Sequence, residues 1–153
     1  MHLERYPIEA SDSFTSFDFD SEGPKGIIRK RIEFKLFENS QRVYNLSFGD
    51  ETKGGRINDK TISNNGDSRK ILFTVAAAVY KFLENHKSSF VYVVGSTKAR
   101  TRLYRMGISN NLSLVSEDFE IFGLTQDGWK EFVKGMDYTA FLVKRKRSNF
   151  IIR

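Results

Sequence analysis

At 153 residues, with 39% hydrophobic and 29% charged side chains, the chain is long and apolar enough for one folded domain, which excludes a disordered protein. Short apolar runs exclude a membrane span and a signal peptide, and the absence of cysteine excludes disulfides, thiolate metal sites and a cysteine nucleophile. The formal charge of +6 either attracts a polyanionic partner or serves solubility alone, and we expect a cytoplasmic protein.

The first half of the chain shows the period-two alternation of half-buried strands. Residues 1–12 are predicted to form an N-terminal arm or a first edge strand, followed by a strand at 14–20. Residues 27–37 and 42–50 are predicted to form an antiparallel hairpin. The side chains predicted to face the core are Phe17, Phe19, Ile32, Phe34, Leu36, Tyr44, Leu46 and Phe48.

A fourth strand at 57–62 is predicted to deliver the chain to a polar loop and then to a long helix that ends at His86. Asp67 or Ser68 can cap this helix by accepting a backbone N–H bond. The helix carries a narrow polar stripe, so we expect its broad apolar remainder to lie against a sheet. The stripe consists of Lys70, Thr74, Ala77, Lys81 and Glu84.

Residues 90–94 form a continuous apolar run, which predicts a central strand that is buried on both faces. It should run parallel to the strand before the long helix, because a helix joins the two. The next helix is predicted to turn Ala99, Leu103 and Met106 inward. Its outward residues are predicted to be Lys98, Arg102, Arg105 and Ser109.

Residues 119–124 and 139–146 read as the two final strands, and 147–153 as a C-terminal extension or an apolar handle for a partner. The whole chain, 1–153, is predicted to form a single mixed α/β (α+β) domain. We expect a twisted, mostly antiparallel sheet of six or seven strands, with one parallel central crossover and two main helices.

A concentration of cations marks the helix after the central strand. Guanidinium groups match phosphate oxygens, and like charges on neighbouring turns destabilise a helix slightly unless an anion offsets them. The alternative is a solvated basic face paired with acidic residues at 117–120. The predicted phosphate or nucleic-acid contacts are Lys98, Arg100, Arg102 and Arg105, together with Arg69.

Two polar loops open the two helices, and we expect them to meet at the carboxyl edge of the sheet, where ligands of open α/β sheets bind. Simple turn chemistry is the alternative for the asparagines. The predicted loop site comprises Asn64, Asn65, Gly66, Asp67, Ser68, Gly95, Ser96 and Thr97. The two histidines, His2 and His86, are isolated, so no metal site is predicted.

The order of strands, loop, helix, strand, helix and strands resembles the core of the GCN-five-related N-acetyltransferases. That family binds the coenzyme A pyrophosphate at backbone N–H groups of the loop before the central helix, where Gly66 matches the family pattern and Ser63 and Ser68 occupy the neighbouring positions. Its later helix carries a tyrosine as general acid, and Leu103-Tyr104 matches that segment. The resemblance implies acetyl-coenzyme A as cofactor and Tyr104 as the acid. Without it, no cofactor is expected.

The segments ISNNGDSRK and GSTKARTRLY resemble a family of small bacterial proteins to which no activity is attached. The leading hypothesis is therefore a basic protein that binds RNA, DNA or another phosphate-bearing partner, with a role in a toxin–antitoxin or defence pair as a guess from class. The alternatives are a divergent acetyltransferase and a ligand-free interaction module or homodimer that uses the C-terminal tail.

Overall fold

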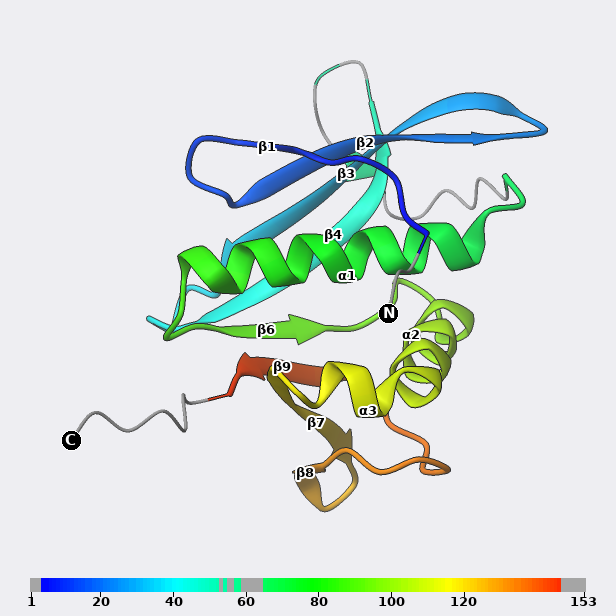
Figure 1. Cartoon of the computed structure of the whole chain (residues 1–153). Coiled ribbons are helices and arrows are strands. Elements are labelled where there is room, and N and C mark those ends of the chain that lie inside the picture. The colour runs from blue at the N-terminus through cyan, green and yellow to red at the C-terminus, as the bar shows by residue number, and fades with distance from the viewer. Residues whose placement is uncertain (1–3, 53, 55–56, 59–64, 147–153) are drawn as a thin grey trace.

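A computed structural model describes residues 4–52, 54, 57–58 and 65–146 (Figure 1). The described elements comprise nine strands and three helices. In chain order they are β1 (Glu9–Ala10), β2 (Ser16–Gly23), β3 (Gly26–Leu36), β4 (Val43–Glu51), β5 (Ile57–Asn58), α1 (Ser68–Asn85), β6 (Phe90–Val93), α2 (Lys98–Asn110), α3 (Leu112–Val115), β7 (Phe119–Thr125), β8 (Gly128–Glu131) and β9 (Phe141–Arg145).

The strands form one mostly antiparallel sheet in the order β1-β2-β3-β4-β6-β9-β7-β8, with β5 beside β4. The mixed α/β class is therefore confirmed, and the predicted count of six or seven strands was too low. The missed strand is β8, which pairs with β7 around a tight turn ending at Gly128, where φ is +101°. Its Asp127-Gly128 dipeptide is a turn signal that could have revealed the hairpin.

The single parallel pair joins β6 to β4, and not to the strand that immediately precedes α1. The prediction named the segment at 57–62 as the parallel partner and was wrong. Its described part, β5, pairs antiparallel with Asp50 and Glu51 at the far end of β4. Because β3 pairs with residues 44–50 along one edge of β4, β5 and β6 share the other edge.

That shared edge of β4 has an opening. β6 pairs only with Val43, Tyr44 and Asn45, and β5 begins only at Asp50. Between them, within the described part of the chain, no strand covers this edge of β4. The two parallel strands therefore separate at the carboxyl end of β6, which is where α2 begins (Figure 1).

The core lies on one face of the sheet. α1 crosses that face, and Ile108, Leu112 and Val115 of α2 and α3 pack against the same cluster (Figure 1). In β6, Val91 and Val93 are buried, whereas alternate residues are half-buried. The expectation that β6 is buried on both faces was wrong, because the described helices pack against only one face of the sheet.

The opposite face is charged at one end and aromatic at the other. On β3, Arg31 lies 2.7 Å from Asp18 of β2, and this hydrogen bond, opposed by desolvation, raises the pKa of the guanidinium. Further along, the Tyr92 ring contacts Phe37 at 5.6 Å and Trp129 at 6.1 Å. Paired charges explain the polar alternation of the first strands. The aromatic rings explain why 90–94 looked uniformly apolar.

α2 is rotated from its predicted face, whereas α1 keeps its predicted core face except at Thr74. In α1, Thr74 is fully buried rather than part of the polar stripe, because its hydroxyl accepts the backbone N–H of Tyr6 at 2.9 Å. In α2, the buried residues are Thr101 and Tyr104, and Leu103 is exposed. No helix among the described residues is both long and apolar enough to cross a membrane.

Candidate functional site

The loop before α1 is anchored to the turn between β2 and β3. Asn65 is 2% exposed, and its side-chain amide donates to the Gly26 carbonyl at 3.0 Å and to Ser21 Oγ at 3.2 Å. Its oxygen accepts the Lys25 N–H at 2.8 Å. Gly66 follows with φ of +74°, a conformation that other L-residues rarely adopt. Asn65 therefore positions the loop, and both N–H groups of its side chain are already used within the protein.

Asp67 occupies the N-cap position of α1, but its carboxylate does not cap the helix. Instead Oδ2 accepts hydrogen bonds from the Tyr6 hydroxyl at 2.5 Å and from Ser21 Oγ at 2.6 Å. The side-chain cap predicted at Asp67 is wrong, since its carboxylate turns back to the N-terminal arm. The first-turn N–H groups of α1 are therefore not satisfied by this carboxylate.

The second loop is fixed by two threonines at the start of α2. Thr97 Oγ1 accepts the Arg100 N–H at 3.1 Å and caps the helix. The Gly95 N–H donates to Thr101 Oγ1 at 2.8 Å, and a Cβ on Gly95 would lie 2.4 Å from the Thr101 nitrogen. Gly95 is thus required for the close approach of β6 to α2.

A cavity of about 760 Å³ lies between these two loops and the facing sides of α1 and α2. Its charged and hydrogen-bonding lining comes from both predicted loops and from β3. The predicted residues that line it are Asn65, Asp67, Ser68, Arg69, Thr97, Arg100 and Tyr104. Gly95 and Ser96 line a neighbouring cavity of about 120 Å³ at the opening between β4 and β6, and Gly66 lines neither. Asn64 and Ser63 lie outside the described residues.

The cations of α2 divide between two surfaces. Arg100 lines both cavities, where its guanidinium donates to the Phe48 carbonyl at 3.4 Å and Ser96 Oγ at 3.3 Å. Lys98, Arg102 and Arg105 do not line the larger cavity. A pairing of these cations with residues 117–120 is absent from the described part of the chain, where Arg105 lies 3.7 Å from Asp137.

Two further side chains, Lys30 and Phe48, line the cavity, and sequence reasoning did not place them in the site. Lys30 of β3 is 4% exposed and forms an ion pair with Asp50 of β4. Its Nζ lies 5.8 Å from the centre of the Phe48 ring, and the Arg100 guanidinium lies 5.5 Å from that centre. A lysine on the core face of a strand breaks the alternation, and this was the available signal.

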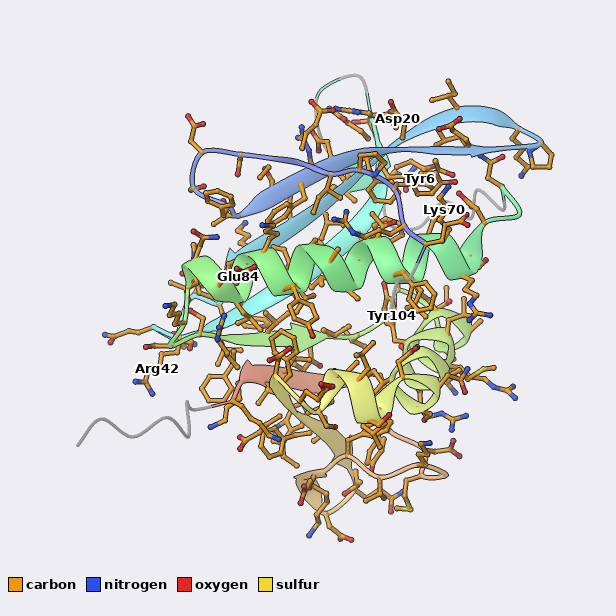
Figure 2. All side chains as sticks on the ribbon, viewed as in Figure 1. Tyr6, Asp20, Arg42, Lys70, Glu84 and Tyr104 are labelled. Carbon is orange, nitrogen blue, oxygen red and sulfur yellow. The ribbon has the colours of Figure 1, made fainter. Side chains whose placement is uncertain are left out.

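Tyr104 lies between the two helices and lines both cavities (Figure 2). It is 8% exposed, and burial raises the pKa of its phenol to about 12, while nearby Arg100 acts in the opposite direction. At neutral pH the hydroxyl is therefore protonated and able to donate a hydrogen bond. Among the described residues, no group of three or more His, Cys, Asp or Glu side chains is placed to hold a metal ion.

Comparison with known proteins gives one match. Residues 2–146 match the model of the Family of unknown function (DUF6934). The chain belongs to this family. The match confirms the expected membership of a family without an assigned activity. No curated protein and no solved structure matches the chain.

Proposed function

We propose that the cavity between α1 and α2 binds a small phosphate-bearing ligand. The observation that carries this proposal is that Arg69 of α1 and Arg100 of α2 line the same cavity as the buried Lys30. Lys30 is already paired with Asp50, so Arg69 and Arg100 supply most of the attraction for an anion, and Asp67, whose Oδ2 accepts bonds from Tyr6 and Ser21, is the acidic side chain in the lining. The N–H groups at the start of α1, which the Asp67 side chain does not cap, add to the attraction for an anion.

The size of the cavity favours a small molecule over a nucleic acid strand. Its volume of about 760 Å³ lies in the range of pockets that enclose cofactors and metabolites. Nucleic acids instead contact exposed cations along an open surface. The outer side of α2 offers such a surface, because Lys98 and Arg102 are exposed and have no ion pair within the described residues. RNA or DNA binding there is the second candidate, and a toxin–antitoxin role would follow from it.

An acetyl-coenzyme A-dependent N-acetyltransferase is the enzymatic form of the proposal. Two features support it: the opening between β4 and β6 beside the cavity, and the protonated Tyr104 hydroxyl next to that opening. With its pKa raised to about 12, Tyr104 is a weaker acid than a thiol of ordinary pKa about 8.5, so its role in this form is to donate a hydrogen bond to the departing sulfur, which takes its proton from water. Stabilisation by millimolar acetyl-coenzyme A in a thermal melt would favour this form, and its absence would count against it.

Two of the arginines of α2, Arg100 and Arg102, supply a matched test of whether the ligand binds in the cavity or on the outer surface. Titration calorimetry with pyrophosphate should show binding that falls about tenfold or more in Arg100→Gln, because a charge-assisted hydrogen bond contributes about 1.5–3 kcal/mol. Arg102→Gln, which removes the same charge from the same helix outside the cavity, should bind as the wild type does.

An electrophoretic shift with mixed RNA and DNA, at two salt concentrations, completes the test. Salt-sensitive retardation that Arg102→Gln weakens more than Arg100→Gln would move the proposal to the outer surface of α2. Equal pyrophosphate affinity in both variants and the wild type would contradict a ligand in the cavity. Thermal melts of each variant check that Arg100→Gln is folded.

A further inference from the structure

We infer that the ligand is amphipathic, a phosphate monoester whose aliphatic group lies against Leu103 and Met106 at the far end of the same cavity. This inference rests on the proposed function and specifies its ligand. The cavity lining is divided: the cations come from β3 and from the first turns of α1 and α2, the following turns of both helices contribute aliphatic side chains, and the end of α2 adds the amides of Asn110 and Asn111.

The aliphatic end is built mainly by α2. Leu103 and Met106 are each 45% exposed and both line the cavity, while the core side of the helix is held by Thr101 and Tyr104. Two large apolar side chains thus stand next to each other in solvent inside a concave site. Covering them with an apolar group removes that surface from water, which is favourable in proportion to the area buried.

α1 closes this end of the cavity. Leu72 lies opposite α2, and a Cβ added to Gly107 would lie 2.1 Å from Leu72 Cδ2. The two helices are therefore in contact at Gly107, and Ile71 extends the aliphatic wall on the α1 side. An apolar group that enters from the cationic end therefore contacts aliphatic side chains of α1 on one side and of α2 on the other. A flat exposed patch would contact it on one side only.

The aromatic rings of the cavity favour an aliphatic group over a nucleobase. A base would stack on a free ring face. The Phe73 ring has the Arg69 guanidinium 5.5 Å from its centre, and the Phe48 ring has both Arg100 and Lys30 within 5.8 Å. Together with Tyr104, these rings are each no more than 9% exposed and offer little free face to a base, whereas Leu103 and Met106 are uncovered.

Titration calorimetry with inorganic phosphate, butyl phosphate, hexyl phosphate and adenosine monophosphate tests the inference. Affinity should rise from phosphate to hexyl phosphate, by about two- to fourfold for each methylene that the cavity covers. Hexyl phosphate should also bind more tightly than adenosine monophosphate. Met106→Ser and Leu103→Ser should flatten the rise with chain length and leave the affinity for inorganic phosphate within about twofold, because neither residue lies at the cationic end.

Met136→Ser is the matched control, since Met136 is 47% exposed but does not line the cavity. It should retain the full dependence on chain length. If phosphate binds and is lost in Arg100→Gln, but chain length has no effect, the amphipathic ligand is refuted and the proposed function stands. If neither phosphate nor hexyl phosphate binds, both are refuted. A chain-length effect that Met106→Ser and Met136→Ser reduce equally places the alkyl group elsewhere and refutes the inference.

Discussion

Tyr6 connects the N-terminal arm to the candidate site through a single hydroxyl group. That hydroxyl donates to Asp67 Oδ2 at 2.5 Å and accepts the Glu22 N–H at 3.0 Å. Its ring stacks on the Phe19 ring, with 5.6 Å between the ring centres. The Lys70 ammonium lies 4.4 Å from the centre of the Tyr6 ring, near the start of α1 (Figure 2). Burial and the bond to Asp67 raise the pKa of this phenol, so it remains a donor at neutral pH.

Replacing Tyr6 by phenylalanine should therefore destabilise the fold by about 1–3 kcal/mol, the cost of removing a buried partner from a charged group. The free energy of unfolding in urea measures it. Tyr80→Phe is the control, because the Tyr80 hydroxyl also bonds a carboxylate, Asp118 at 3.1 Å, but at an exposed site. That change should cost less than about 1 kcal/mol. If Tyr6→Phe lowers the free energy of unfolding by no more than Tyr80→Phe does, the hydrogen bond between the N-terminal arm and Asp67 does not stabilise the fold.

Among the elements, the turn between β2 and β3 and the loop before α1 depend on each other. The side chain of Asn65 makes hydrogen bonds to this turn, and Gly23 allows the two backbones to touch. A Cβ at Gly23 would lie 1.9 Å from the Asn65 carbonyl oxygen, well inside contact distance. The hairpin thereby determines where the first turn of α1 and its N–H groups lie.

Gly23→Ala should consequently displace this loop and cost about 1–3 kcal/mol, as overpacking does elsewhere. It should also weaken pyrophosphate binding, because the N–H groups of α1 and Arg69 would move with the loop. Gly54→Ala is the control, since a Cβ there meets nothing within 4 Å. Thermal melts and calorimetry on both variants measure the two effects. If Gly23→Ala is destabilised but binds pyrophosphate with unchanged affinity, the position of this loop does not affect ligand binding.

At the scale of the whole molecule, the sheet runs without interruption from β1 to β8 through the β4–β6 and β6–β9 pairs. The core cluster likewise contains residues from both halves, including Phe17 and Phe34 as well as Phe119 and Phe141. A continuous core is the physical basis for one cooperative unit, which is what a single domain means thermodynamically.

Urea unfolding followed by two probes tests that unit. Trp129, the single tryptophan, lies on the edge strand β8 and contacts Tyr92, so its fluorescence reports the C-terminal end of the sheet. Far-ultraviolet circular dichroism reports mainly α1. The two transitions should coincide. A fluorescence transition at lower urea than the helical one would show that β7 and β8 unfold separately and would contradict a single cooperative domain.

The sequence by itself determined most of the elements, although not β8, and the chemistry of the loops. Alternation placed Phe17, Ile32 and Leu46 on the core face, and the polar loops marked both helix starts, because these patterns follow from local geometry. It also placed Arg69 and Arg100 in the first turns of helices whose preceding loops were expected to converge, and both line one cavity. Each of these inferences needs only the period of an element and the order of elements along the chain.

Only the tertiary structure decided which edge of β4 receives β6, which way α2 turns, and that Lys30 lies beneath the cavity. Strand pairing is a competition among distant segments, and the rotation of a helix depends on what covers it. Leu103 and Met106 look like core residues in the sequence because an apolar side chain has the same pattern in a core and in a cavity. The difference lies in whether another element covers them, and that is a property of the folded molecule alone.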